Sequence, residues 1–459
     1  MTSLTFHGAT DTVTGSRHLL EVDGKQVLVD CGLFQGPRAI RARNWQPFPV
    51  PPKSLDAVVL THAHLDHTGY LPCLVKRGYR GPIHCTRATL DLLGIMLLDA
   101  ARLQVEEAEY ANRKGCSRHQ PALPLYDEED ARKVLGLLEG HDYGETFEPE
   151  AGMRMHYLRA GHILGSAFIM TEVESTRILF GGDLGRYGQS IIPDPTPVSR
   201  ADYLLIESTY GNRDHQGVDV HAELERIVRR AARDRGWVLI PSFAIGRAQE
   251  VLYLLEDLRR SGRIPAVPIY LDSPMATSAV PLFVRHTQDH DLEMTALMDS
   301  DRCPFESPNL TFVHTRDDSK RLNDVEGPAI LIAGSGMANG GRIRHHLIVR
   351  APDPRNVVLF VGYQGEGTPG RALLDGAPTF RAFGWEVPVR ARIERLDALS
   401  AHADRGEMMR WLSGFETPPQ RTFLVHGEPD ARAALSARIQ AELGWNVHSP
   451  ALGETVDLN

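Results

Sequence analysis

The stretch Thr61-His62-Ala63-His64-Leu65-Asp66-His67 decides the fold of this chain. It follows the apolar segment 56–60, which predicts a short buried strand. Imidazole nitrogen and carboxylate oxygen are ligands of borderline metals such as zinc. Residues two apart in an extended chain point the same way, so the first two histidines are expected to hold one ion. The aspartate and the last histidine lie on the next turn, where they are expected to hold a second. The stretch therefore predicts a two-metal hydrolase.

A structural alternative applies to the same residues. Histidines and an aspartate at a strand-to-helix corner could cap a helix that starts near Thr68. A lone His-x-His pattern would leave that alternative open. The full His-x-His-x-Asp-His pattern, directly after an apolar strand, favours metal binding.

Three further candidate ligands, His162, Asp183 and His426, stand at the ends of other predicted strands. Taken singly, a turn histidine is more often solvated, and Asp183 could be an ordinary turn aspartate. Active sites gather at strand ends, so these three residues together with the His62–His67 stretch indicate one site. A carboxylate such as Asp183 is suited to bridge two cations.

Glu207 and His402 also close apolar strands. The functional interpretation is a histidine that a nearby carboxylate positions and keeps protonated, ready to donate a proton. The structural alternative places His402 before a helix that Asp404 caps.

Length and composition are those of a two-unit globular enzyme. With 459 residues the chain is too long for one ordinary core, and 42% of its residues are apolar and 24% charged. The net charge of −9 argues against a protein that coats nucleic acid non-specifically. No apolar run reaches the length of a membrane span, and the N-terminus lacks a signal sequence. The odd cysteine count, without a Cys-x-x-Cys pair, fits a reduced cytoplasm; the cysteines are Cys31, Cys73, Cys85, Cys116 and Cys303.

The order of predicted elements indicates an α/β protein. The first two hundred residues alternate short strands with glycine-rich turns. From about Gly211 strands alternate regularly with helices, which predicts a parallel sheet flanked by helices. Strands are expected again at 387–393 and 422–425.

In this order the motifs resemble the metallo-β-lactamase superfamily and, within it, the β-CASP nucleases. Asp30 in Val29-Asp30-Cys31-Gly32 matches the first motif of the family. The stretch from His62 to His67 matches the second motif, His162 the third and Asp183 the fourth. Glu207, His402 and His426 fall where β-CASP motifs A, B and C belong. The similarity spans nearly the whole chain and is greatest to bacterial relatives of the pre-mRNA 3′-end cleavage endonuclease subunit.

This resemblance implies a metallo-β-lactamase αββα sandwich built from residues 1–208 and 386–459, with a β-CASP domain inserted at 209–385. It implies two zinc ions, with Asp183 bridging them and Asp30 orienting ligands. The implied ligands are His62, His64 and His162 for one ion, and Asp66, His67 and His426 for the other. A histidine at the position of His426 is associated with RNA-directed members of the family.

The implied activity is hydrolysis of phosphodiester bonds in single-stranded RNA. A hydroxide shared by the two zinc ions attacks the phosphate, Asp66 belongs to the catalytic set, and His402, held by Glu207, protonates the departing oxygen. The form Ser-Ala-His-Ala-Asp around His402, and the lack of the additional domains of some relatives, favour internal cleavage. No membrane partner is expected, and a homodimer is an assembly that the sequence leaves open. The predicted substrate contacts are Arg247, Ser335, Gly336, Arg342 and Ser400.

Two alternative functions stay open. One is a small-molecule hydrolase on the same scaffold, acting on a thioester, a lactone or a β-lactam. The large insert with Glu207 and His402 argues against it, because such enzymes need no second domain. The other is a non-catalytic subunit of an RNA-processing complex. Such subunits typically lose metal ligands, whereas every ligand position is filled in this chain.

Overall fold

A computed structural model describes residues 1–117, 119–215 and 217–458, which fold into two compact units. The first unit comprises residues 1–187, 194–214 and 402–459, and the second comprises residues 188–193 and 215–401. Residues 386–401 lie in the second unit, whereas the predicted division assigned them to the C-terminal part of the first. The physical reason is that β19 (Arg392–Arg395) pairs in parallel with β16 (Val357–Phe360).

Two mixed sheets form the first unit. Within the described residues, one has seven strands in the order β22 (Thr455–Asp457), β1 (Thr2–Phe6), β2 (His18–Val22), β3 (Lys25–Val29), β4 (Ala57–Val59), β5 (Ile83–Thr86) and β6 (Leu138–His141). The other, over the same part of the chain, has seven in the order β21 (Val447–His448), β20 (Arg421–Val425), β11 (Tyr203–Glu207), β10 (Thr176–Phe180), β9 (Ala167–Val173), β8 (Met153–Arg159) and β7 (Thr146–Glu150).

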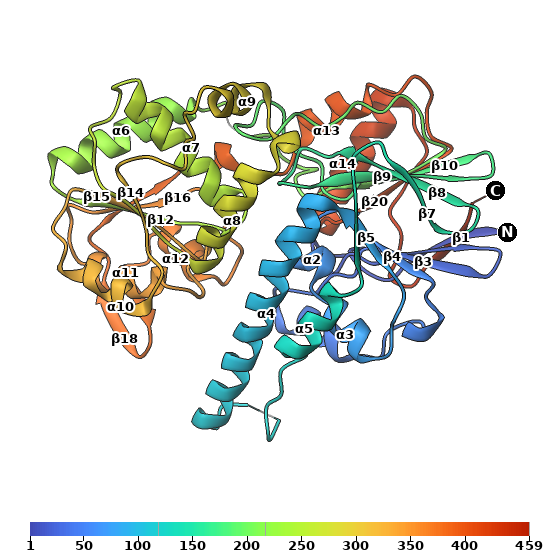
Figure 1. The fold of residues 1–459 in the computed structure, drawn as a ribbon, viewed down its shortest axis with the longest axis horizontal. Helices are drawn as coiled ribbons and strands as arrows, with labels where there is room; N and C mark the ends of the chain where they lie inside the picture. The colour runs from blue at the N-terminus through green and yellow to red at the C-terminus, as the bar shows by residue number, and fades with distance from the viewer. Residues whose placement is uncertain (118, 216, 459) are drawn as a thin grey trace. The chain divides into compact units, whose positions relative to one another are not determined.

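Helices cover both sheets of this unit (Figure 1). On the side of the first sheet lie α2 (Leu65–Thr68), α3 (Leu71–Lys76), α4 (Arg87–Lys114) and α5 (Glu128–Leu135), and on the side of the second lie α13 (Arg405–Leu412) and α14 (Pro429–Leu443). Short helices α1 (Arg38–Arg41), η1 (Ala42–Trp45) and η2 (Pro52–Ser54) lie between β3 and β4 in the chain.

Buried apolar residues hold these four layers together. One core lies between the sheets, where Phe6 of β1 contacts Phe423 of β20 with ring centroids 5.1 Å apart. A second core packs Leu204 and Leu424 of the second sheet against Trp411 and Leu435 of the helices. The predicted αββα sandwich is therefore confirmed.

The second unit is built on a parallel sheet. Within the described residues its six strands run in the order β14 (Leu310–Phe312), β13 (Ile269–Asp272), β15 (Ala329–Ala333), β12 (Trp237–Pro241), β16 and β19. Its helices are α6 (Val220–Arg233), α7 (Arg247–Arg260), α8 (Pro274–Arg285), α9 (Leu292–Asp299), α10 (Arg316–Arg321), α11 (Ile343–Arg350) and α12 (Pro369–Leu374), with the short turns η3 (Thr287–Asp289), η4 (Leu322–Asp324) and η5 (Asp397–Leu399). The predicted parallel sheet flanked by helices is confirmed.

The strand expected at 387–393 is two strands. Residues 385–388 form β18 (Trp385–Pro388), which pairs in an antiparallel hairpin with β17 (Thr379–Ala382). Beyond this pairing the backbone N–H of Val389 donates to the carbonyl of Pro378 at 2.9 Å, but Pro378 has no N–H to return the bond, so the hairpin ends there and β19 joins a different sheet.

Across the described residues, no helix combines the length and the apolar character needed to cross a bilayer.

Candidate metal centre

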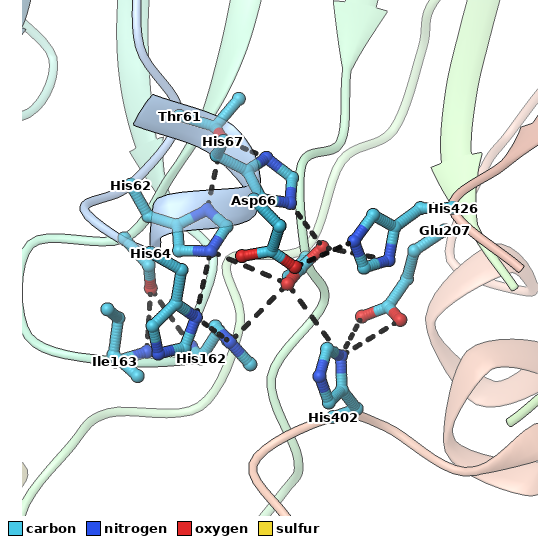
Figure 2. A network of polar contacts seen from close by, with 12 residues as sticks. Thr61, His62, His64, Asp66, His67, His162, Ile163, Glu207, His402 and His426 are labelled. Carbon is cyan, nitrogen blue, oxygen red and sulfur yellow. Dashed lines mark hydrogen bonds and ion pairs between the residues drawn. The ribbon is translucent and has the colours of Figure 1, made fainter. Parts of the chain in front are cut away.

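The corner after β4 carries the stretch from His62 to His67. α2 ends at Thr68 instead of starting near it, and His64, which precedes α2, makes no side-chain hydrogen bond to its backbone. The capping alternative therefore does not explain these histidines. Their side chains turn instead toward residues from β8–β9, β10–β11 and β20 (Figure 2).

Seven side chains from the first unit converge there, and we call them the ligand cluster: His62, His64, Asp66, His67, His162, Asp183 and His426. One group of donors surrounds the Nδ1 atom of His64. This atom lies 3.1 Å from Nε2 of His62 and 3.2 Å from Nε2 of His162. The same two Nε2 atoms lie 3.4 and 3.5 Å from Oδ2 of Asp183.

A second group faces the other oxygen of Asp183. Oδ1 lies 3.3 Å from Nε2 of His67 and 3.5 Å from Nδ1 of His426. The carboxylate of Asp66 completes this group, 3.4 Å from Nε2 of His426. The two oxygens of Asp183 thus each face a separate set of donors.

The chemistry of the ligand cluster fits divalent metal ions. Asp183 is 1% exposed, and within the described residues neither of its carboxylate oxygens, nor Nε2 of His67, has a hydrogen bond. A buried carboxylate without hydrogen bonds is costly unless cations face it. Burial opposes the ionisation of Asp183, but His426, His67 and His62 outweigh burial and hold its pKa well below the usual range. The site therefore presents an anionic carboxylate among imidazoles, as metal ions require.

A buried acid and a hydroxyl orient His67. Nδ1 of His67 lies 2.7 Å from Oδ2 of Asp30, so it donates there and leaves Nε2 for an ion. Asp30 in turn accepts hydrogen bonds from the backbone N–H and the hydroxyl of Thr61, at 2.8 and 2.9 Å. This geometry supports the role predicted for Asp30, which stays a prediction. Sequence reasoning did not single out Thr61, whose signal was its position directly before His62.

A hydroxyl group contacts His426 in a comparable way. The hydroxyl of Thr209 lies 3.2 Å from Nδ1 of His426, which favours Nε2 as the nitrogen offered toward Asp66. The Thr209 contact joins the loop after β11 to the loop after β20, and no local pattern in the sequence indicates it.

The backbone at two of these positions is unusual. Asp30 follows β3 with φ +60°, and His426 follows β20 with φ +49°, both in the left-handed region that non-glycine residues rarely adopt. Such conformations persist where surrounding contacts enforce them, and they are frequent at functional sites. The backbone N–H of His426 donates to the carbonyl of Ala9 at 2.7 Å, which fixes the turn.

Glu207 and His402 form a pair beside the ligand cluster. Nδ1 of His402 lies 3.0 and 3.1 Å from the two carboxylate oxygens of Glu207, which is fully buried. The backbone N–H of Leu184 donates to the same carboxylate at 2.7 Å and holds it in place. Burial opposes the charge on His402, but Glu207, with Asp183 and Asp66, outweighs burial and raises the pKa of His402 to about 9. Nδ1 of His402 is also 3.8 Å from Oδ2 of Asp183.

The residues predicted to contact substrate all lie in the second unit: Arg247, Ser335, Gly336, Arg342 and Ser400. Arg342 donates to Asp272 at 2.6 Å and to the carbonyls of Val313 and His314, so its guanidinium ties strand ends together. The buried guanidinium of Arg247, at the start of α7, pairs with Glu250. The contact of these residues with substrate stays a prediction.

Models of three known domain families match successive parts of this chain. Residues 13–240 match the metallo-beta-lactamase superfamily, residues 248–373 the Beta-Casp domain, and residues 386–450 the Zn-dependent metallo-hydrolase RNA specificity domain. A solved structure from Enterococcus faecalis, of a protein of unknown function, covers 100% of both chains with a TM-score of 0.59 and 14% identity, which shows likeness of fold alone.

Curated relatives match over almost the full length. The chain is 41% identical over 450 residues to a ribonuclease from Thermus thermophilus, covering 98% of each chain. It is 30% identical over 432 residues to an RNase J-like protein from Methanocaldococcus jannaschii, covering 93% of each. It is 31% identical over 475 residues to transcription termination factor FttA from Cenarchaeum symbiosum, covering 99% of this chain and 71% of the relative. The chain therefore belongs to the β-CASP ribonuclease family of metal-dependent hydrolases in the metallo-β-lactamase superfamily.

Proposed function

We propose that this protein is a zinc-dependent ribonuclease that hydrolyses phosphodiester bonds inside single-stranded RNA. The observation that carries the proposal is the His402–Glu207 pair, which lies beside seven convergent metal-type ligands. Relatives named ribonuclease and RNase J-like protein support RNA as the substrate class.

Two ions would be held by the two donor groups that share Asp183. One would use His62, His64 and His162, and the other Asp66, His67 and His426. Histidine nitrogen with carboxylate oxygen is a ligand set that zinc accepts readily. When bound, such ions activate water near neutral pH and neutralise charge that develops on a phosphate.

His402 would supply the proton that the departing sugar oxygen needs. Its Nδ1 atom lies 3.0 and 3.1 Å from the carboxylate oxygens of Glu207, which fixes the orientation of the ring, and Nε2 would be the nitrogen that donates the proton. The ring is 23% exposed, which leaves a path for a substrate oxygen to approach it. Asp66 would act as a metal ligand and as part of the catalytic set.

Circular single-stranded RNA tests this proposal. The zinc-loaded protein is expected to open the circle and to leave 5′-phosphate and 3′-hydroxyl ends, whereas an exonuclease needs an end and leaves circles intact. End-labelled linear RNA, incubated in parallel, reports the polarity of any exonuclease activity.

The same preparation should be assayed with a thioester and a lactone. Turnover of either, without cleavage of circular or linear RNA, would overturn the proposal in favour of a small-molecule hydrolase. Failure of the zinc-loaded protein to turn over any of these substrates would favour a non-catalytic subunit.

A further inference from the structure

A second group of metal-type donors lies at the edge of the first sheet, where β5 and β6 pair in parallel. His84 of β5 is the register partner of Glu139 of β6, and His141 follows Glu139 by two residues. Register partners, and residues two apart on a strand, share one face of a sheet. The topology therefore places all three side chains together, and none of them belongs to the ligand cluster.

The donor atoms are close enough to share one ion. Nδ1 of His84 lies 3.0 Å from Nε2 of His141 and 3.5 Å from Oε2 of Glu139. One donor atom from each residue lies within 4.8 Å of the other two. Nε2 of His84 is buried without a hydrogen bond among the described residues, so Nδ1 is the nitrogen that a cation can reach.

Aromatic packing holds the two imidazoles in this arrangement. The ring of Phe147 stacks on His141, with centroids 4.0 Å apart and planes at 14°, and lies 5.2 Å from the ring of His84. His84 is 5% exposed, which leaves it little freedom to move.

The surroundings also supply an outer carboxylate and access to solvent. Nδ1 of His141, the nitrogen that faces away from the cluster, lies 3.7 Å from Oε1 of Glu145. A carboxylate on the outer nitrogen is the usual partner of a metal-bound histidine. The side chain of Glu139 is 58% exposed, so an ion can enter from water and keep water as a further ligand.

We propose that His84, Glu139 and His141 form an additional cation site that takes one divalent transition metal such as Zn²⁺. The site is independent of the catalytic proposal, because it uses none of the residues assigned to RNA cleavage. An ion there would join β5 to the edge strand β6 and so stabilise the fold instead of taking part in chemistry.

Zinc counting with single variants tests this site. The full chain is dialysed to equilibrium against low-micromolar Zn²⁺, and zinc per chain is measured by mass spectrometry. His141→Gln and Glu139→Gln are each expected to hold one zinc fewer than the unaltered chain. The matched control is His156→Gln, since His156 is a partly buried histidine on β8 and is not in the cluster. It is expected to keep the full count.

Thermal unfolding supplies a second readout, in a background in which zinc binding to the ligand cluster is weakened. With Asp183→Asn as background, saturating Zn²⁺ is expected to raise Tm by at least about 2 °C, and His141→Gln in that background is expected to reduce the rise, whereas His156→Gln is expected to leave it unchanged. Equal zinc counts in the unaltered chain and in both variants would overturn the proposal. The contact between His84 and His141 would then be a hydrogen bond between two neutral imidazoles. Because these readouts do not use RNA, a failure of the ribonuclease proposal would not alter them.

Discussion

Asp183 is the residue on which the ligand cluster depends. Each of its oxygens faces a different pair of imidazoles of the ligand cluster, at 3.3 to 3.5 Å. A single carboxylate is thus the only group in the ligand cluster positioned between both sets of donors within the described residues. Its amide counterpart has the same shape but no charge, so it isolates the contribution of the negative charge.

Asp183→Asn is expected to abolish RNA cleavage and to lower the zinc content of the protein, because the bridging charge is removed. Elemental analysis and an RNA assay on the same sample measure both effects. Asp202→Asn, which changes a carboxylate outside the ligand cluster, serves as control. Full zinc content in Asp183→Asn would contradict a bridging role.

His402→Ala is expected to retain zinc and to lower turnover of RNA by about 10²- to 10⁴-fold, the scale of general acid–base catalysis. The variant should lose little activity on bis(p-nitrophenyl) phosphate, because nitrophenolate leaves without protonation. An equal loss on both substrates would mean that His402 does not act as the acid.

The pH dependence of cleavage follows from the pair that His402 makes with Glu207. His402 has its pKa raised to about 9, so it is protonated at neutral pH and loses its proton as the pH rises through that value. Glu207→Gln removes the charge that raises this pKa. The alkaline limb of the profile of kcat against pH is therefore expected to move to lower pH. Glu172→Gln, on β9, should leave the profile in place.

At the scale of elements, close approaches between loops set the position of the ligands. The loop after β3 runs against α2, where the backbone N–H of Cys31 donates to the carbonyl of His67 at 2.6 Å. A Cβ atom at Gly32 would lie 1.6 Å from the carbonyl oxygen of Asp66. Only glycine allows this contact, so Gly32 lets the loop after β3 pack closely against α2, which carries Asp66 and His67.

Gly32→Ala is expected to displace α2 and so to lower both Tm and zinc content. Gly94→Ala is the matched control, because a Cβ at Gly94 in α4 meets nothing within 4 Å. Alanine at that helical position should leave Tm unchanged or raise it, since it is favoured over glycine by about 1 kcal/mol. Unchanged zinc content in Gly32→Ala would show that the loop does not position α2.

The sequence predicted the elements better than the contacts between them. The alternation of strands with helices predicted the parallel sheet of the second unit, and the family resemblance implied the two sheets of the first unit. The metal-binding role of the candidate ligands at strand ends stays a prediction. The hydrogen bonds from Thr61 to Asp30 and between Thr209 and His426 were not predicted, because residues far apart in the chain form them. The His84–His141 contact was missed for the same reason, since 57 positions separate the two residues.

At the scale of the molecule, the ligand cluster includes a residue, His426, from the part of the chain that follows the second unit in sequence. His402 and His426 follow residues 215–401, and β20 then inserts beside β11 in the interior of the second sheet. The boundary predicted at 385 differs from the division at 401 because β19 completes the sheet of the second unit. Hydrophobic patterning alone did not locate this boundary, since strands 392–395 and 421–425 are alike in length and differ in the partner they pair with.

Anomalous X-ray scattering at the zinc absorption edge, from crystals of the zinc-loaded protein, tests the central claim most directly. We predict two peaks on either side of the Asp183 carboxylate, about 3.5 to 4 Å apart. One of them should be bounded by His62, His64 and His162, and the other by Asp66, His67 and His426. A single peak in the ligand cluster, or two peaks without Asp183 between them, would contradict the account.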